Sequence, residues 1–281
     1  MKKVAIITDS SAYLPQNLVD VLGIHVVPLT LHWEDQTFRD GIDIQAEAFY
    51  ERLSNANNIP TTSQTPVDVF EKLFQKLLDE DYAVFAMLIS SGISGTVDSA
   101  LQAKKSFPDA PLEVLDSQLV SMALGFMVLT VARAAKDGAS LEECVALAKA
   151  TFPKIGVYFT VDTLKYLNKG GRINTAKRLL GAALDVKPIM EIRDGKIELL
   201  ESVRSRKKSL ERMLELVERD ISQHEHVRIS TFHAAAENDC QKLMDEAVSR
   251  FSPIETIMTY VSPVIGSHTG PGTVSIAYLA G

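Results

Sequence analysis

The sequence predicts an α/β protein with two domains: an N-terminal Rossmann-like domain with a parallel sheet, and a C-terminal α/β domain with a mixed sheet. The chain of 281 residues exceeds the size at which one core stops growing, so we expect domains at 1–156 and 157–281. Short apolar runs alternate with helix-like segments from the start, which indicates β-α-β units and a parallel sheet. Asp194-Gly195 between two apolar runs predicts a hairpin, which favours antiparallel pairing in the second domain.

The first domain opens with a strand at 3–8, a turn at 9–11, a helix after Pro15 and a strand at 24–31. Proline suits the first turn of a helix because its missing N–H is not needed there. Further helices are expected at 45–54, 67–78, 97–105, 120–136 and 141–150, and further strands at 83–89 and 112–115. Ser140 and Glu143 have the spacing of a capping box. The apolar stretch 120–132 falls short of the roughly 20 residues that a membrane span needs, so we expect a buried core helix.

The second domain continues with alternating strands and helical segments. Strands are expected at 155–161, 189–192, 196–203, 227–232, 255–260 and 274–278. Helical segments are expected at 163–168, 175–184, 207–221 and 239–251. Apolar residues recur at helical spacing in the third of these segments. No long linker separates the two halves, so the domains should pack closely and share a site.

Composition and charge limit the class of protein. Apolar residues make up 46% of the chain and charged residues 23%, as in ordinary globular proteins, and the net charge is −7. Cys144 and Cys240 are far apart, so we expect no disulfide framework, no zinc site and a cytoplasmic location. Asp9 interrupts the first apolar run, so no signal peptide is expected. Residues 163–212 hold 13 Lys and Arg against 6 Asp and Glu; this basic segment indicates an anionic partner or a solvated helix face.

Two hydroxyl-rich segments precede predicted helices. Ser90-Ser91-Gly92-Ile93-Ser94-Gly95-Thr96 follows the strand at 83–89, so its hydroxyls and N–H groups face the positive end of a helix dipole, where anions bind. It is not a Walker loop, because the sequence contains no Gly-x-x-x-x-Gly-Lys-[Ser/Thr]. The second segment is Thr61-Thr62-Ser63-Gln64-Thr65-Pro66, read as a loop. Both segments have helix capping as an alternative role. Loops at the carboxyl ends of neighbouring strands would converge on one ligand.

A glycine-rich loop and a basic cluster complete the candidate residues. The loop Gly266-Ser267-His268-Thr269-Gly270-Pro271-Gly272-Thr273 has no Cys, Asp or Glu beside its His, so it offers neither a catalytic triad nor a metal set. A lone loop His is also typical of a hydrogen-bonded structural group. The basic cluster contains Arg172, Arg204 and Arg206. Arg binds phosphate bidentately, and a solvated basic face is the alternative.

These segments together resemble the DegV family. The resemblance rests on Ile7-Thr8-Asp9-Ser10, Thr62-Ser63-Gln64, the segment 90–96, Leu164-Lys165-Tyr166-Leu167, Gly170-Gly171-Arg172-Ile173 and the segment 266–272. They occur in the order of the family and cover nearly the whole chain, residues 4–279. One departure is Thr65-Pro66-Val67, where the family often has Pro-Ser-Pro, so the loop path after Gln64 stays open.

The resemblance implies a fatty-acid-binding protein of the FakB kind, which encloses one fatty acid and presents its carboxylate to an ATP-dependent fatty acid kinase. The acyl phosphate then enters phospholipid synthesis. The resemblance implies no catalytic residue, no metal and no cofactor besides the fatty acid, and it leaves room for transient contact with a membrane surface. The implied carboxylate-binding residues are Thr62 and Ser94, with Thr61 and Ser63 as the register alternative, and Gly95, Thr96 and His268. The residues implied in presentation to the kinase and in phosphate contact are Arg172, Arg204 or Arg206, and His268.

Two other classes of function are alternatives. A small-molecule phosphotransferase or hydrolase would use Ser94 and His268, but the sequence shows no nucleotide loop, metal set or evident acidic partner for the His. A nucleic-acid-binding module would use the basic segment, but aromatic residues are not interleaved with its Lys and Arg and the chain is acidic. We therefore expect a lipid-binding protein, not an enzyme, with no nucleic-acid partner. The acyl-chain preference and the oligomeric state do not follow from the sequence.

Overall fold

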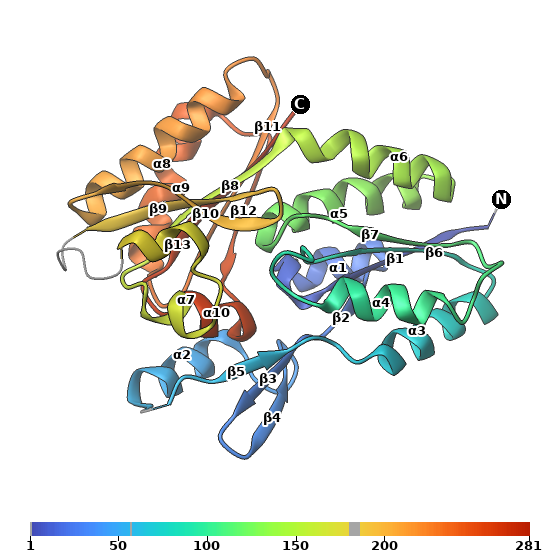
Figure 1. Cartoon of the computed structure of the whole chain (residues 1–281). Helices are drawn as coiled ribbons and strands as arrows, with labels where there is room; N and C mark the ends of the chain where they lie inside the picture. Colours follow the sequence, from blue (N-terminus) through green and yellow to red (C-terminus); the bar gives the residue numbers. More distant parts are fainter. Residues whose placement is uncertain (1, 57, 180–185) are drawn as a thin grey trace.

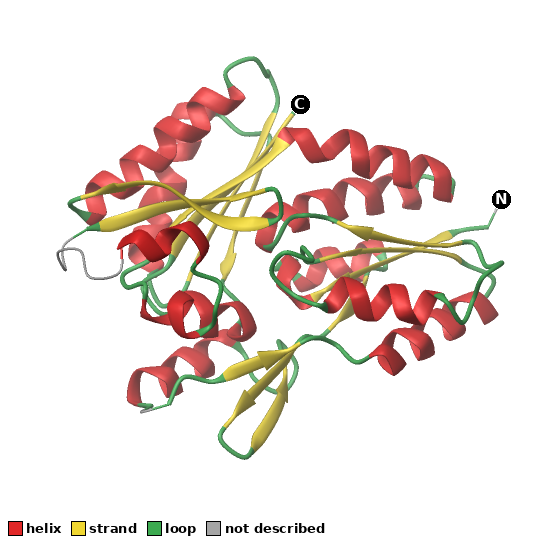
Figure 2. Ribbon diagram, in the orientation of Figure 1, coloured by secondary structure: helices red, strands yellow, loops and turns green. Residues whose placement is uncertain are grey.

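The computed structural model describes residues 2–56, 58–179 and 186–281 and has the predicted α/β fold. Two sheets with helices on their faces lie side by side, and a small three-stranded sheet lies below their junction in this view (Figures 1 and 2). The N-terminal sheet is parallel and the C-terminal sheet is mixed, as predicted. The boundary after residue 156 stays a prediction; β8 (Ile155–Thr160) pairs within the C-terminal sheet.

The N-terminal sheet has the strand order β2-β1-β6-β7, and each neighbouring pair is parallel. Its strands are β1 (Val4–Asp9), β2 (His25–Val27), β6 (Ala83–Leu88) and β7 (Leu112–Asp116). Every side chain of β1 and β6 is buried, as expected for central strands covered on both faces. One face is covered by α3 (Val67–Asp79) and α4 (Thr96–Lys104). The other carries η1 (Ser10–Ala12), α1 (Gln16–Leu22), α5 (Ser121–Lys136) and α6 (Leu141–Thr151), which has the predicted capping box.

The C-terminal sheet has the strand order β10-β9-β8-β13-β11-β12. β11 and β12 are parallel, the other neighbouring pairs are antiparallel, and so β8, β11 and β12 all run in the same direction. The strands after β8 are β9 (Lys187–Arg193), β10 (Lys196–Val203), β11 (Val227–His233), β12 (Glu255–Tyr260) and β13 (Val274–Ala280). The predicted hairpin turn is present, with φ of 49° at Asp194 and 73° at Gly195.

Helices cover both faces of the C-terminal sheet. One face packs against α8 (Arg206–Ile221) and α9 (Glu237–Phe251). The other packs against α5 and against α7 (Lys165–Lys169) and η3 (Asn174–Leu179). A short helix, η2 (Phe152–Lys154), leads into β8. The predicted helix at 175–184 is therefore a 3₁₀ helix as far as Leu179, and residues 180–184 lie outside the described residues.

The third sheet joins the two halves. It has the order β4-β3-β5 and consists of β3 (Thr30–Trp33), β4 (Gln36–Arg39) and β5 (Thr61–Ser63). Both α2 (Ala46–Asn55) and α10 (Pro263–Thr269) lie beside it. The Tyr50 hydroxyl of α2 donates to the carbonyl of Val261, 2.9 Å away, at the start of the segment that leads into α10. This contact holds the C-terminal α10 against the N-terminal half.

One hydrophobic core serves both halves. On one side α5 packs against β1 and β6, and on the other against β8 and β13. Residues 121–129 of α5 are all buried, so the predicted buried core helix is confirmed. The same apolar cluster contains Phe85 of β6, Phe126 of α5 and Phe232 of β11. In the described part of the chain, no helix combines the length and apolar character that a membrane crossing requires.

The predicted single strand at 24–31 is wrong. The structure has two strands there, β2 in the parallel sheet and β3 in the three-stranded sheet, separated by Pro28 and Leu29. Proline has no N–H to donate to a neighbouring strand, so the chain leaves the parallel sheet at Pro28.

Two segments predicted as loops contain regular structure. Residues 61–63 form β5, which pairs with β3. The glycine-rich segment that holds His268 is helical up to Thr269. The Ser262 side chain caps this helix and Pro263 occupies its first turn, while Gly270 ends it at a φ of 77°. His268 therefore sits on a helix, not in a loop.

Candidate functional site

The two hydroxyl-rich segments meet α10 in one pocket of about 260 Å³ at the carboxyl end of β6, which we call the hydroxyl pocket. It is lined by Leu29, Thr62, Ser63, Gln64, Ile89, Ile93, Ser94, Gly95, Arg172, Val264, Ile265 and His268. Six of these were candidates from the sequence alone. The fold thus brings together residues far apart in the chain, such as Thr62 and His268, which are separated by 206 positions.

β5 determines which hydroxyl of its segment faces α10. The Thr62 hydroxyl lies 2.8 Å from Nε2 of His268. Side chains alternate along a strand, so Thr61 and Ser63 project to the other side. Thr61 is exposed and does not line the pocket, while the Ser63 hydroxyl lies 2.9 Å from Nε2 of His32. Thr62 is therefore the hydroxyl of this segment that contacts α10.

The loop after β6 supplies the second hydroxyl. Ser94 Oγ lies 2.9 Å from Thr96 Oγ1, and Thr96 is wholly buried and does not line the pocket. Gly95 is the N-cap of α4 and has no side chain to cap the helix, while the N–H of Thr96 donates to Ser94 Oγ at 3.4 Å. A Cβ at Gly95 would collide with the Gln64 side chain, which donates to Ser99 Oγ at 2.9 Å. The pocket thus opens on a helix N-terminus, which favours an anion.

Arg172 and His268 set the electrostatics of the pocket. Arg172 is fixed by the carbonyls of Ile93, at 3.2 Å, and Gly170, at 2.6 Å. Burial, together with the nearby Arg172 charge, lowers the pKa of His268 to about 4. His268 is therefore neutral near pH 7. Its Nδ1 is buried with no hydrogen-bond partner among the described residues, and it lies where a Cβ of Gly170 would be.

Asp40 anchors α10 from the N-terminal half. Its carboxylate accepts hydrogen bonds from Ser10 Oγ, at 2.6 Å, and from the N–H of Val264, at 3.2 Å. Asp40 is 2% exposed, and burial raises its pKa to about 6. No motif in the sequence indicated this residue, because its partners come from segments far apart in the chain.

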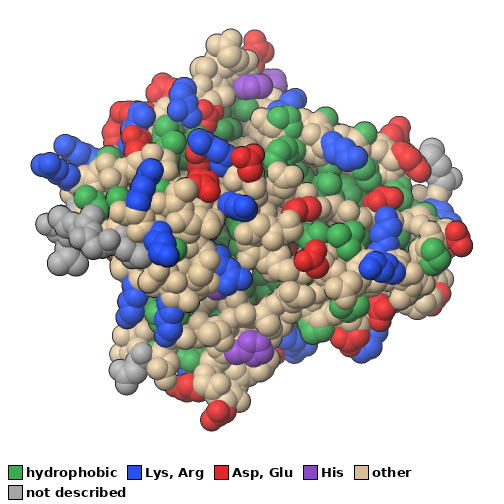
Figure 3. Space-filling model, viewed as in Figure 1, with side chains coloured by type: hydrophobic (Ala, Val, Ile, Leu, Met, Phe, Trp, Pro, Cys, Tyr) green, Lys and Arg blue, Asp and Glu red, His purple; other side chains and the backbone are tan. Residues whose placement is uncertain are grey.

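The other two candidate arginines lie outside the hydroxyl pocket. Arg206 donates from Nε to Asp239, at 2.9 Å, and from Nη2 to the carbonyl of Gly272, at 2.7 Å. Arg204 is exposed between β10 and α8. Figure 3 shows Lys and Arg side chains gathered on the left of this face, over the part of the fold that contains α7, β9 and β10. Arg204 is thus the accessible member of the pair.

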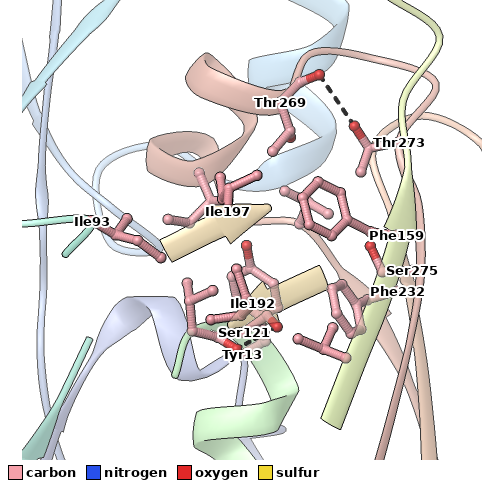
Figure 4. A pocket seen from close by; sticks show the side chains of 14 residues that line it. Tyr13, Ile93, Ser121, Phe159, Ile192, Ile197, Phe232, Thr269, Thr273 and Ser275 are labelled. Atoms are coloured by element: carbon pink, nitrogen blue, oxygen red, sulfur yellow. Dashed lines mark hydrogen bonds between the residues drawn. The ribbon is translucent and has the colours of Figure 1, made fainter. Parts of the chain in front are cut away.

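A second cavity, of about 50 Å³, lies between the two large sheets and is lined mostly by apolar side chains; we call it the apolar cavity (Figure 4). Its lining residues are Tyr13, Ile93, Val120, Ser121, Val157, Phe159, Ile192, Ile197, Phe232, Val261, Ile265, Thr269, Thr273 and Ser275. Hydroxyls in this lining turn to the backbone: Ser121 donates to the Val120 carbonyl and Thr273 to that of Gly270, 2.8 Å away. Ile93 and Ile265 line both cavities, so the two adjoin.

The β9–β10 hairpin covers the apolar cavity and reaches the N-terminal half at its tip. Ile192 of β9 and Ile197 of β10 both line the cavity. At the turn, Ser90 Oγ donates to the carbonyl of Gly195 at 2.7 Å. A Cβ at Gly92 would lie 2.5 Å from the same carbonyl oxygen, so glycine permits the close approach. We call this contact the hairpin clasp.

The arrangement is suited to binding an anionic head group, not to a triad. Thr62, and not Ser94, is the hydrogen-bond partner of His268 Nε2. Hydroxyls, Gly95 at the N-terminus of α4 and Arg172 line the hydroxyl pocket, and hydroxyls, backbone N–H groups and guanidinium groups can each donate to an oxyanion. Within the described residues, no group of three or more His, Cys, Asp or Glu side chains is placed to hold a metal ion.

Comparison with known protein families gives the same family as the sequence motifs indicated. The family described as "Uncharacterised protein, DegV family" matches residues 3–281. The chain belongs to the DegV family. Protein DegV of Bacillus subtilis (strain 168) is 34% identical to it over 276 residues, which is 98% of each chain.

Solved DegV structures share the whole architecture. A fatty-acid-binding DegV family protein from Thermus thermophilus is 31% identical with a TM-score of 0.94, and DegV of Bacillus subtilis, a fatty acid binding protein, is 33% identical with a TM-score of 0.91. Each comparison covers 100% of both chains. The DegV fold therefore extends over the full length of this chain.

Sequence reasoning missed most of the apolar cavity. Its lining comes from many separate segments, and residues such as Phe159 and Phe232 read in the sequence as ordinary buried strand positions. The hairpin clasp was also missed, although Gly92 and Gly195 both belong to segments that the sequence singled out. The contacts at Gly92 and Gly195 depend on how the two halves of the protein pack, and no local sequence pattern reveals that packing.

Proposed function

We propose that this chain encloses one long-chain fatty acid, with its acyl chain in the apolar cavity and its carboxylate in the hydroxyl pocket. One observation carries the proposal: a cavity lined mostly by apolar side chains adjoins a pocket that contains hydrogen-bond donors, and the two share Ile93 and Ile265. A molecule that suits both has a long apolar body with one anionic end. Two relatives at 31% and 33% identity are fatty-acid-binding proteins, which supports the same ligand class.

Simple energetics support this arrangement. Burying an acyl chain contributes about 0.8 kcal/mol per methylene, or on the order of 10 kcal/mol for a long chain. A carboxylate buried without donors would cost several kcal/mol or become protonated. Thr62, Ser94 and the first turn of α4 are suited to supply those donors, and Arg172 adds a positive charge at the same pocket.

The second part of the proposal is that the chain works in the cytoplasm and presents the carboxylate to a fatty acid kinase, for acyl phosphate formation that feeds phospholipid synthesis. Transient contact with a membrane surface through the basic segment belongs to the same proposal. Arg172 and His268 line the hydroxyl pocket and Arg204 is exposed, which suits residues that meet a partner and a transferred phosphate. The kinase supplies the ATP site in this scheme, and the chain acts as its lipid-binding component.

The direct test is the lipid content of the purified protein. An enclosed acyl chain leaves slowly, because leaving exposes its methylenes to water. Organic extraction of freshly purified, unfolded protein, followed by mass spectrometry, should release close to one fatty acid per chain. A matched preparation of an unrelated protein of similar size controls for lipid carry-over. Recovery of no more than the control amount from folded protein would contradict the proposal.

A further inference from the structure

A much larger cavity, about 1150 Å³ in volume, lies elsewhere in the fold, and among the described residues it shares no lining residue with the hydroxyl pocket or the apolar cavity. It lies between α2 and the edge of the C-terminal sheet where β8, β11 and β12 end, and we call it the sheet-edge cavity. Open α/β sheets bind ligands at the carboxyl ends of their strands. Its lining residues are Gln45, Ala46, Glu47, Tyr50, Glu51, Ser54, Asp162, Lys187, Arg206, His233, Ala235, Ala236, Glu237, Asn238, Asp239, Tyr260 and Gly272.

His233 lines this cavity and carries a buried, unpaired donor. The residue ends β11 and is 3% exposed. Its Nδ1 accepts a hydrogen bond from the N–H of Ala236 at 3.2 Å, so in the neutral ring the proton sits on Nε2. Nε2 is buried and has no hydrogen-bond partner among the described residues. A buried N–H without an acceptor is costly, which points to an acceptor on a ligand.

Arg206 supplies a second free donor. Its Nε and Nη2 are held by Asp239 and by the Gly272 carbonyl, which fixes the plane of the guanidinium. Its Nη1 is buried and has no hydrogen-bond partner within the described residues. The carboxylate of Asp162 lies 4.0 Å away, beyond hydrogen-bond range, and pairs with Lys187 at 2.9 Å. Arg206 is therefore rigidly held, with the N–H groups of its Nη1 unused.

The N-terminus of α9 lies at the same place. α9 has 15 residues and begins after Ala236, which provides no side-chain cap. Residues 236–239 all line the sheet-edge cavity, so the N–H groups of the first turn add to the donors of His233 and Arg206. His233, Arg206 and the first turn of α9 thus all line this cavity, and a helix N-terminus beside further N–H donors suits an oxyanion.

Acidic side chains exclude a strongly negative ligand. Glu47 and Glu51 of α2 and Glu237 of α9 also line the cavity, and all three are exposed. A doubly charged phosphate would meet this negative charge, whereas an ammonium group would be attracted to it. We propose that the sheet-edge cavity binds a small zwitterion of the amino-acid class, with its carboxylate on the free N–H groups of His233, Arg206 and α9 and its ammonium group facing the three glutamates.

The test uses the full chain loaded with fatty acid and four probes: L-serine, 3-hydroxypropionate, ethanolamine and inorganic phosphate. 3-Hydroxypropionate is serine without its ammonium group, and ethanolamine is serine without its carboxylate. We expect serine to bind most tightly in calorimetry and to shift the NMR signals of the His233 ring. Serine failing to bind, or binding no more tightly than either of its halves or than phosphate, would overturn the proposal.

Variants locate the site. Arg206→Lys and Glu47→Gln should each weaken serine binding about tenfold or more, as expected for loss of a hydrogen bond to a charged group. Glu47→Gln should not weaken 3-hydroxypropionate binding, because that probe has no ammonium group for Glu47 to attract and its carboxylate is repelled by the glutamate charge. Lys208→Ala, which removes an exposed basic residue of α8 that lines none of the three cavities, is the matched control and should bind serine like the parent. Melting temperature and fatty acid content, measured on the same samples, separate a folding defect or a failed fatty-acid site from loss of this site. Parent-like serine binding by both Arg206→Lys and the exposed Glu47→Gln variant would overturn the proposal.

Discussion

At the scale of single residues, the hydroxyl residues proposed to hold the carboxylate are Thr62 of β5 and Ser94 of the loop after β6, which both line the hydroxyl pocket. We predict that Thr62→Ala and Ser94→Ala each weaken fatty acid binding by about 1–3 kcal/mol, the cost of leaving a buried acceptor unsatisfied. Displacement of a fluorescent fatty acid measures this. Thr61→Ala is the control, because Thr61 is exposed and lies off the pocket. Equal losses for Thr61→Ala and Thr62→Ala would show that the strand register proposed for the carboxylate is wrong.

Substitutions of the residues proposed for presentation to the kinase should have different effects from substitutions of the residues proposed for fatty acid binding. We predict that His268→Ala and Arg204→Ala keep most of the fatty acid but lose most acyl phosphate formation when kinase and ATP are supplied. Arg suits phosphate oxygens that develop during transfer, and neutral His268 borders the carboxylate position. Lipid content and turnover are assayed on one preparation, with the exposed Lys208→Ala as control. Parent-rate turnover by both variants, or joint loss of lipid and turnover, would contradict these roles.

Asp40 and His268 should give opposite pH dependences of stability. The pKa of Asp40 is raised to about 6, so the folded state keeps a proton that the unfolded chain has lost, and stability falls as pH rises from about 4 to 6. The pKa of His268 is lowered to about 4, so stability falls as pH drops from about 6.5 to 4. Each shift of about two pKa units corresponds to roughly 3 kcal/mol.

Single variants expose these two opposed contributions. Relative to the parent, Asp40→Asn should make lipid-free protein lose more stability on acidification, and His268→Gln should make it lose less. Urea unfolding at about pH 4.5 and pH 7 measures the difference between variants, in which the other titrating groups cancel. The same slope for parent and Asp40→Asn would mean that Asp40 does not titrate in this window.

The sequence identified residues of the hydroxyl pocket where chemically suitable side chains cluster within a short motif. Thr62, Ser94, Gly95, Arg172 and His268 stood out in the sequence because hydroxyls, glycines and basic residues cluster there, and the fold brings them together. Their roles in binding and presentation stay predictions. Asp40 could not be found this way, because an acidic residue in a polar segment gives no sign that it will be buried beside Ser10 and α10.

At the scale of secondary-structure elements, the β9–β10 hairpin is the part whose contacts most directly close the apolar cavity. Gly92→Ala places a methyl group 2.5 Å from the backbone oxygen of Gly195, which cannot move without moving the hairpin. We predict that this variant releases fatty acid faster, with little change in secondary structure. Stopped-flow transfer of the fatty acid to albumin measures the release rate. Ser91→Ala, one residue away and exposed, is the control. An unchanged release rate would show that the hairpin clasp does not limit exit.

Helices and strands were predictable from the sequence where the hydrophobic pattern extends over one long, continuous segment. The strands at β6 and β12 and the helices α3, α5 and α6 lie within two residues of their expected bounds. The division of residues 24–31 into two strands depends on Pro28. β5 is three residues long, which is too short for the alternation of buried and exposed side chains to be recognised in the sequence. α10 was hidden because its glycines suggest a loop, while its start depends on Ser262 and Pro263.

At the scale of the whole molecule, the apolar cavity is smaller than its proposed ligand. Ligand pockets hold roughly 300–1,000 Å³, whereas this cavity holds about 50 Å³, so an acyl chain requires its walls to separate. A ligand that binds the folded state stabilises it by about 2.7 kcal/mol at a hundredfold excess over Kd. We predict that palmitate raises the melting temperature of lipid-free protein, while methyl palmitate, which lacks the carboxylate, raises it less.

Hydrogen exchange reports the accompanying movement. Protection in β9 and β10 should change on loading, because Ile192 and Ile197 line the cavity, whereas protection in α3 should not, because α3 covers the far face of the N-terminal sheet. Equal shifts with palmitate and its methyl ester would mean that the hydroxyl pocket contributes nothing. The absence of any shift would count against enclosure of the ligand.

The core that α5 shares with both sheets also bears on how the protein is made. The chain delivers β13 after every other strand, yet β13 lies between β8 and β11 and packs against α5. Until the ribosome has released β13, the C-terminal sheet is split at its centre and one side of α5 is only partly covered, by β8. The nascent chain therefore carries an exposed apolar surface from the synthesis of α5 until β13 emerges, the condition under which chaperones engage a growing polypeptide.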